Sequence, residues 1–179
     1  ETVPPPGYKL SAAELTVTVK QGAASETYTL NEGNAVVNEQ NEFTVSKKDA
    51  ATGEVLGGAE FTLSGEFADG TDSLVWTSGD HAEAVAGKLI GYGRVYTLEE
   101  TGVPQHYLAA PSLELKMDAE GALYQRAPGA TAWSRVEANA LTVLNSPVRG
   151  HVTLTKTVAD DGVGTVAGVE FSLYKAGTD

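Results

Sequence analysis

The sequence predicts an all-β protein folded as an antiparallel sandwich. Valine and threonine occur 19 times each and glycine 20 times, whereas isoleucine occurs once, and this mixture favours strands broken by turns. Short segments of alternating apolar and polar residues recur along the chain, with turn residues between them at intervals of roughly 8–12 residues. Many short strands at this spacing are typical of a β-sandwich.

Four segments carry the alternation most clearly: residues 15–19, 43–47, 141–144 and 152–156. The side chains of a strand switch faces at each residue, so these segments predict antiparallel strands with one dry and one wet face. Turn signals such as Ala51-Thr52-Gly53 separate the strands. Only His81–Leu89, with its alanines, has a composition that admits a short helix.

Charge and composition exclude several classes of function. Asp and Glu number 24 against 12 Lys and Arg, which gives a formal net charge of -12. Such a chain repels phosphate and anionic lipid, so we expect no nucleic-acid partner and no membrane contact. Cysteine is absent, which excludes disulfides, thiolate zinc sites and cysteine nucleophiles. The apolar runs fall far short of the roughly 20 residues that span a bilayer, so we expect a soluble chain.

Three sequence elements recur about 100 residues apart. The first is a strand that ends in lysine and is followed by a Gly-x-Glu-Phe-x-Leu strand, at 43–63 and again at 152–173. The second is Glu-Thr followed by Pro and Tyr, at 1–8 and 100–107. The third is an apolar run that closes on asparagine, at Asn38 and at Asn145.

These recurrences predict a tandem repeat cut out of phase. Residues 1–38 are expected to be the C-terminal part of one unit, 42–146 a complete unit, and 149–179 the N-terminal part of the next. The linkers between the units are short, so successive units should stand in a stiff row. The chain begins without an initiator methionine or a leader, and we therefore expect it to be an excerpt from a longer protein.

The complete unit contains three residues whose side chains can react with one another: Lys47, Glu100 and Asn145. Lys47 continues the inward set of Phe43 and Val45, so alternation directs its amine at the core. Burial lowers the pKa of a lysine and leaves a free amine that can act as a nucleophile. A carboxylic acid in the same dry site can stay protonated and polarise an amide carbonyl.

We therefore predict that Lys47 attacks the side-chain amide of Asn145 while Glu100 shuttles protons. Loss of ammonia would leave a Lys-Asn isopeptide cross-link. Proximity drives the reaction, because well-oriented groups reach effective molarities of roughly 10⁵–10⁸ M. The reaction turns over once and consumes no outside substrate, so the chain is not expected to be an enzyme.

Together these residues resemble a known family. The pattern consists of the strand-end lysine, the Gly-Ala-x-Phe-x-Leu strand, the Tyr-x-Leu-x-Glu-Thr box with its following Pro and Tyr, and the last strand ending in Asn. It resembles the collagen-adhesin B-type (Cna B-type) repeats of Gram-positive surface proteins and pilins.

The resemblance implies a prealbumin-like, Ig-like fold. It also implies a structural stalk, secreted and held at the cell wall on the surface of a Gram-positive bacterium. The stalk would hold a distal binding domain away from the wall. The family's functional positions fall on Lys47, Glu100 and Asn145, on Glu1 and Asn38 of the first partial repeat, and on Lys156 of the last.

Two features of the complete unit bear on this assignment. The family's Pro-x-Gly-Tyr turn, nearly present at Pro5–Tyr8, is replaced at 104–107 by a turn with His106 in place of glycine. The missing glycine predicts an altered turn after Glu100. Lys48 directly follows Lys47, and a slip of one residue in register would exchange the two amines; alternation favours Lys47.

A second function stays open, that of a binding module whose loops 64–74 and 124–135 hold a host matrix protein or a glycan. Aromatic and arginine side chains of the kind that recognition sites favour lie there, namely Tyr124, Arg126, Trp133 and Arg135. Other large apolar residues are expected in the core or on sheet faces, together with Trp133 itself: Phe61, Leu63, Trp76, Tyr96 and Leu98.

Neighbouring repeats of the same chain are the expected partners of either kind of module. The partial units also suggest head-to-tail strand complementation between chains, because Glu1 and Asn38 lie in one fragment and Lys156 lies in the other.

We expect no cofactor and no metal. The three histidines, His81, His106 and His151, lie in different segments without the spacing of metal ligands. Gly91-Tyr92-Gly93 lacks the rest of a phosphate-binding loop. The Asp-bearing loops at 69–72 and 160–162 match no complete calcium loop.

Overall fold

The computed structural model describes residues 1–12, 14, 36–156 and 168–173. The chain divides into two compact units, Glu1–Val148 and Arg149–Asp179. The strand expected at 15–19 lies outside the described residues. Among the residues that are described, no helix has the length and apolar character needed to cross a membrane.

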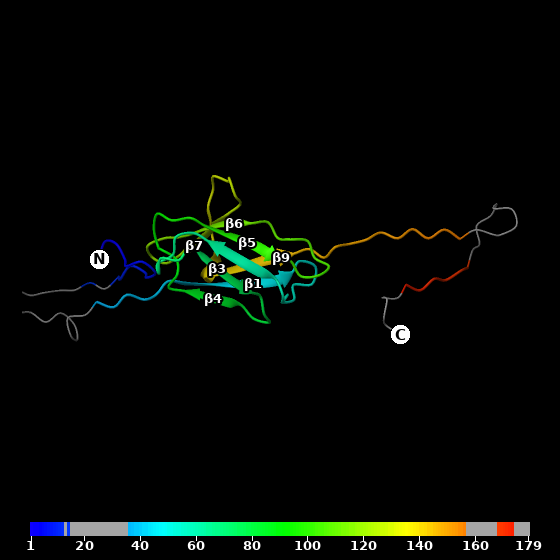
Figure 1. Ribbon diagram of the computed structural model, residues 1–179, viewed down its shortest axis with the longest axis horizontal. Coiled ribbons are helices and arrows are strands. Elements are labelled where there is room, and N and C mark those ends of the chain that lie inside the picture. The colour runs from blue at the N-terminus through cyan, green and yellow to red at the C-terminus, as the bar shows by residue number, and fades with distance from the viewer. Residues whose placement is uncertain (13, 15–35, 157–167, 174–179) are drawn as a thin grey trace, which may run out of the picture. The chain divides into compact units, whose positions relative to one another are not determined.

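The first unit has nine strands in its described part, arranged in two sheets (Figure 1). The smaller sheet has the order β4-β1-β9 and consists of β1 (Glu42–Asp49), β4 (Glu83–Ala86) and β9 (Ala140–Asn145). The larger sheet has the order β3-β2-β5-β6-β7-β8. Its strands are β2 (Glu60–Ser64), β3 (Ser73–Thr77), β5 (Tyr96–Gly102), β6 (Leu113–Met117), β7 (Leu123–Arg126) and β8 (Ser134–Arg135). A 3-10 turn, η2 (Glu137–Asn139), leads into β9.

The strands predicted at 43–47 and 141–144 are confirmed as β1 and β9, but their pairing differs from the expectation. The two strands run parallel and side by side (Figure 1), with Lys47 opposite Val143 and Asp49 opposite Asn145. The remaining strand pairs in the described part of the chain are antiparallel. The parallel pair joins the first and last strands of the unit, which no hairpin connects, so no turn dictates their direction.

The segment 81–89 contains β4 and not the short helix that its composition admits, because Val85 is buried opposite Phe43 and completes the small sheet. One expected strand is absent. Residues 152–156 form no strand, and Val152 and Leu154 are 72% and 61% exposed. An isolated strand leaves its backbone groups and its apolar face without partners, so alternation alone does not form one.

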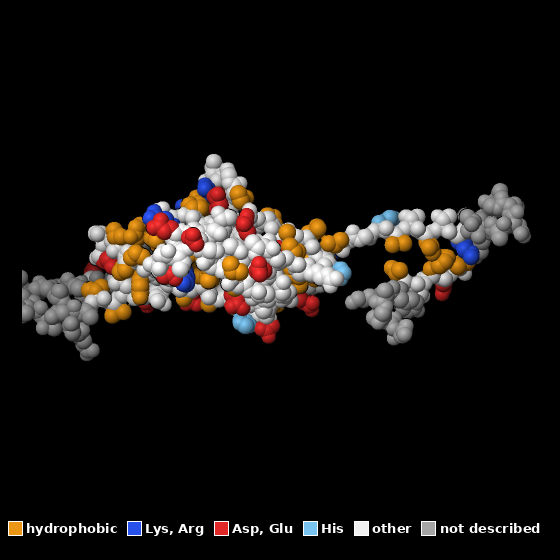
Figure 2. Space-filling view, viewed as in Figure 1, with side chains coloured by type: hydrophobic (Ala, Val, Ile, Leu, Met, Phe, Trp, Pro, Cys, Tyr) orange, Lys and Arg blue, Asp and Glu red, His pale blue; other side chains and the backbone are white. Residues whose placement is uncertain are grey.

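The core lies between the two sheets, where alternation places apolar residues on the facing sides. Phe61, Leu63, Tyr96 and Leu98 are buried there, as predicted. Trp76 packs against the core from the edge strand β3 and stacks on Phe61, with 5.4 Å between ring centroids. The outer surface differs in kind: acidic side chains are spread over the face shown in Figure 2, with few basic ones among them.

A buried Lys-Glu-Asn site as the candidate functional site

The two sheets bring Lys47, Glu100 and Asn145 together in the core. Lys47 is the third inward residue of β1, and Asn145 is the last inward residue of β9. Because β1 and β9 are parallel and in register, both side chains leave the same face of the small sheet near the same end. Glu100 reaches them from β5 of the facing sheet.

All three side chains are closed off from solvent. Lys47 is 2% exposed, Asn145 is 0% exposed, and the side chains of Lys47 and Glu100 are both 0% exposed. The Lys47 Nζ donates to Asn145 Oδ1 and lies 3.3 Å from Glu100 Oε1. The Asn145 Nδ2 donates to the same Glu100 oxygen at 2.7 Å. Amine, amide and acid therefore form a closed triangle of contacts.

Glu100 is held from its other side by the backbone. Its second oxygen, Oε2, accepts a hydrogen bond from the Ala110 N–H at 2.6 Å. The pairing of β2 with β5 shifts register directly after Glu100, because Phe61 pairs with Glu100 while Glu60 pairs with Gly102. Such irregularities often redirect a side chain next to a functional site. Sequence reasoning missed the Ala110 donor, since a backbone N–H leaves no mark in side-chain chemistry.

The electrostatics of the site follow from its dryness. Burial lowers the pKa of Lys47 from its ordinary value, and the neighbouring Glu100 carboxylate opposes this by favouring the ammonium. The net effect is a lowered pKa, because a fully enclosed ammonium has lost its hydration. The Phe61 ring adds an aromatic wall, with its centroid 5.5 Å from Lys47 Nζ.

A second acid and amide pair, Glu1 with Asn38, lies in the N-terminal segment. The Asn38 Nδ2 donates to Glu1 Oε2 at 2.6 Å, and the Ser11 N–H donates to the same oxygen at 2.7 Å. The amide hydrogen of Ser11, followed by the Asn38 side chain, holds the pKa of Glu1 below its usual range. Unlike Glu100, Glu1 is exposed. Lys156, the lysine expected to match Lys47, is exposed and belongs to the other compact unit.

The two acid and amide pairs share their backbone connections. Each glutamate accepts a hydrogen bond from the N–H ten residues later, Ser11 or Ala110. Each following turn closes in the same way, with Tyr8 N–H donating to Pro5 O at 3.0 Å and Tyr107 N–H donating to Pro104 O at 3.2 Å.

The chain leaving each asparagine repeats a bond as well. The N–H of Lys9 donates to the carbonyl of Glu39, and that of Leu108 donates to the carbonyl of Ser146.

The expected change in the turn after Glu100 is absent. His106 takes φ 72°, close to the 84° of Gly7, so a left-handed residue stands in both turns. His106 bears the steric cost that glycine avoids.

The residues of the predicted binding loop form a cluster on the outer face of the larger sheet. Lys116 Nζ lies 4.7 Å and the Arg126 guanidinium carbon 4.3 Å from the Trp133 ring centroid. The Arg126 Nε also pairs with Glu114 Oε2 at 2.5 Å. Tyr124 is contacted by Lys116, and Arg135 is exposed on β8. Two cations thus lie over the Trp133 ring and connect the loop 127–133 to β6 and β7.

The fold and this site define a class: a prealbumin-like β-sandwich whose core encloses a lysine, a glutamate and an asparagine in mutual contact. Residues 41–126 match the family model described as the SpaA prealbumin-like fold domain. This part of the chain has the prealbumin-like fold, which is consistent with the Cna B-type repeats that the sequence resembles. A search of curated proteins gave no match.

Several solved structures are similar to the chain. A C-terminal fragment of the pilus adhesin SpaC from Lactobacillus rhamnosus GG is 22% identical, with a TM-score of 0.46, over 65% of this chain and 49% of that one. A variant of the shaft pilin SpaA from the same organism is 25% identical, with a TM-score of 0.43, over 85% of this chain and 62% of that one. The chain thus spans about half the length of the first structure.

No group of three or more metal-ligating side chains occurs in the described part of the chain.

Proposed function

We propose that the chain is a structural stalk segment of a pilin or adhesin, whose complete domain is locked by an isopeptide bond between Lys47 and Asn145. The contact of a buried amine with a buried side-chain amide, both touching one carboxylate, carries the proposal. Burying a lysine costs free energy unless the lysine has a chemical or electrostatic role, and the contacts of Lys47 with Glu100 and Asn145 supply one.

The reaction begins with a proton transfer. A charged ammonium and carboxylate in a dry site are both poorly solvated, and moving one proton from Lys47 Nζ to Glu100 removes both charges. The neutral amine then attacks Cγ of Asn145, and the carbonyl electrons move onto Oδ1. Because the reactants are held in contact before reaction, the entropic cost of bringing them together has already been met by folding.

The second half of the reaction expels ammonia. Glu100 delivers its proton to Nδ2 of Asn145, which it already contacts at 2.7 Å. The bond between Cγ and Nδ2 breaks, and the carbonyl re-forms. The new amide nitrogen keeps one hydrogen and sheds the other to Glu100. One ammonia leaves for each bond formed, no cofactor is needed, and the site does not turn over again.

The same proposal covers the organisation of the chain. We assign residues 1–38 to the end of one repeat, 42–146 to a complete repeat and 149–179 to the start of another. The matched hydrogen bonds around Glu1 and Glu100 support this assignment, because they repeat at equivalent positions of two recurring segments. Glu1 and Asn38 are then the acid and amide of the preceding repeat, and Lys156 is the lysine of the following one.

We place the chain outside the cell, at the wall of a Gram-positive bacterium, with neighbouring repeats as its direct partners. The match to a SpaA prealbumin-like domain supports this placement. A host matrix protein or glycan would bind elsewhere in the full-length protein. Labelling intact cells with an antibody against the central domain tests the location, and label that appears only after lysis contradicts it.

Tandem mass spectrometry of a proteolytic digest tests the chemistry. We expect one branched peptide in which Lys47 is joined to Asn145, found at the mass of the two peptides less one ammonia. Lys48→Ala is the matched control, because it removes the neighbouring amine and should leave the branched peptide unchanged. Two separate, unmodified peptides covering Lys47 and Asn145 would rule the bond out.

A further inference from the structure

The N-terminal segment does not lie loosely beside the central domain. Leu10 N–H donates to the carbonyl of Ala119 at 2.8 Å, which ties the segment to the turn before β7. Asn41, next to β1, continues the β1–β4 pairing, since Gly87 N–H donates to its carbonyl at 2.8 Å. Asn41 is 1% exposed, and its Nδ2 donates to the carbonyl of Leu89 at 2.5 Å. We call the receiving backbone around Gly87, Leu89 and Ala119, together with Gly121, the seat.

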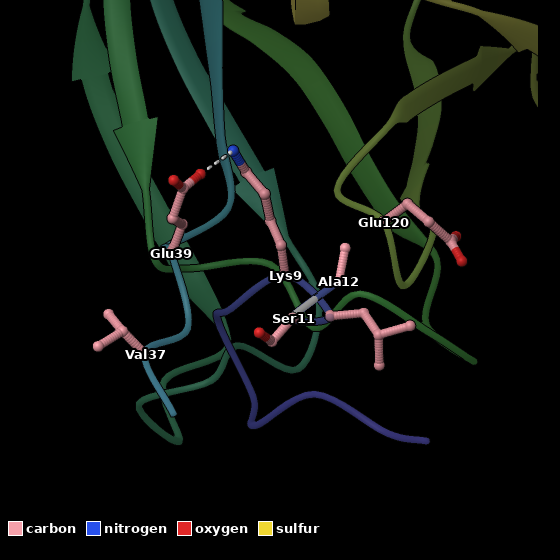
Figure 3. Close-up of a pocket in the computed structure, with 7 residues that line it drawn as sticks. Lys9, Ser11, Ala12, Val37, Glu39 and Glu120 are labelled. Carbon is pink, nitrogen blue, oxygen red and sulfur yellow. Dashed lines mark hydrogen bonds and ion pairs between the residues drawn. The ribbon is translucent and has the colours of Figure 1, made fainter. Parts of the chain in front are cut away.

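At two glycines, Gly7 and Gly121, neighbouring atoms lie too close for a Cβ. A Cβ built on Gly7 would lie 2.5 Å from the carbonyl oxygen of Gly87, and one built on Gly121 would lie 2.7 Å from Cγ of Lys9. The first obstacle is backbone and cannot yield, whereas the second is a flexible side chain. The Lys9 side chain passes Gly121 and pairs with Glu39 at 3.4 Å, bordering a hollow of about 370 Å³ whose lining also includes Glu120 (Figure 3).

The equivalent end of the central domain lacks each of these fitting features. His106 stands at the position of Gly7, Leu108 at that of Lys9, and Val148 at that of Asn41, as their matched hydrogen bonds show. Leu108 and Val148 are 57% and 56% exposed. The two ends share the same backbone hydrogen bonds. Only the N-terminal end has a glycine that allows the close approach to Gly87 and an asparagine whose side chain donates to the carbonyl of Leu89.

We propose that the seat is a selective docking surface for the end of a preceding repeat, and that glycine at the third position of the Pro-x-Gly-Tyr turn is its specificity determinant. The seat accepts the turn at residues 5–8 and excludes a turn such as 104–107, in which that position carries a Cβ. The contact that joins one pair of successive repeats therefore cannot be replaced by the contact that joins the next pair. This inference uses the repeat assignment proposed above, but it does not depend on the isopeptide bond.

Gly7→His in the full chain tests the proposal, because His106 shows that histidine fits this turn at φ 72°. Amide hydrogen exchange reports the two sides separately. We expect protection to fall at least tenfold at Leu10, whose bond to Ala119 crosses the joint, and to persist at Lys9, whose bond to Glu39 lies within the segment. The mass deficit from the Lys47 site should be unchanged.

Gly53→His is the matched control, since Gly53 has φ 76° and a Cβ there would meet no atom within 4 Å. It introduces the same backbone strain without a contact and should leave Leu10 protected. Asn41→Val, which copies Val148, should also lower protection at Gly87 by removing the bond to Leu89. Unchanged protection at Leu10 in Gly7→His overturns the proposal. Loss of protection at Lys9 as well also overturns it, because the turn itself would then have failed.

Discussion

The site around Lys47 and the pair around Glu1 use one backbone arrangement with opposite exposure. Both have a glutamate held by an N–H ten residues later and by an asparagine side chain. Only Glu100 is enclosed, because β1 and β9 of the small sheet close over β5. Both segments therefore bring acid and amide together, whereas the dryness that frees the amine of Lys47 requires the whole sandwich.

Removing the amine of Lys47 should cause the largest loss of stability. In Lys47→Ala we expect the free energy of unfolding to fall by roughly 4–5 kcal/mol, the value that chain-entropy arguments give for closing a loop of this size. The two linked residues are 98 positions apart in the chain. Denaturant unfolding measures the loss. Asn38→Ala, at the exposed pair, should leave the transition where it is, and an equal loss in both variants would contradict the comparison.

Removing the acid should affect the rate of bond formation at one site only. We expect Glu100→Gln to slow cross-linking by roughly 10²–10⁴-fold, the usual contribution of a general acid-base group. Intact mass followed over time in newly synthesised chain measures the rate. Glu1→Gln is the matched control and should leave the rate unchanged. A Glu100→Gln chain that cross-links as fast as the original would show that the carboxyl plays no chemical part.

The pH dependence separates the roles of Lys47 and Glu100. With Glu100 present, the proton passes from Lys47 to its neighbour and need not be lost to solvent, so the rate should depend little on pH around neutrality. In Glu100→Gln the residual rate should rise with pH, because only the neutral amine reacts. That rise should level off below the ordinary lysine value of 10.5, since burial lowers the pKa of Lys47. A residual rate still rising at that pH would contradict a desolvated amine.

The smallest expected effect concerns the turns that follow the two glutamates. His106→Gly should stabilise the domain by about 0.5–1 kcal/mol, because glycine relieves the left-handed backbone at some cost in chain entropy. Thermal unfolding measures the gain. A loss of stability would mean that His106 makes contacts that outweigh its strain.

The sequence was sufficient for the residues that alternate and recur. Phe43, Val45 and Lys47 predicted the inward face of β1, and the recurring Glu-Thr box pointed to Glu100 before any contact was known. It was not sufficient for features set by chain direction and backbone shape. The parallel pairing of β1 with β9, the Ala110 N–H on Glu100 and the close approach of Gly7 to Gly87 depend on long-range packing that no local pattern records.

Alternation also failed in a segment for which the described residues offer no partner strand. Residues 152–156 have the same pattern as 43–47, yet Val152 and Leu154 remain exposed and form no strand. The pattern indicates which face a strand would bury, but the neighbouring strands decide whether it forms. Lys156 and Lys47 occupy matching positions of the repeated sequence, yet Lys156 is exposed and Lys47 is buried between paired strands.

Intact-mass spectrometry of the unmodified chain tests the central claim most directly. If Lys47 and Asn145 have reacted, the folded chain is lighter than its sequence mass by one ammonia, while Lys47→Ala and Asn145→Ala have the full masses of their own sequences. The difference should persist after complete denaturation, because the bond is covalent. A wild-type chain at its full sequence mass would contradict the account and leave Lys47, Glu100 and Asn145 as a buried hydrogen-bonded cluster.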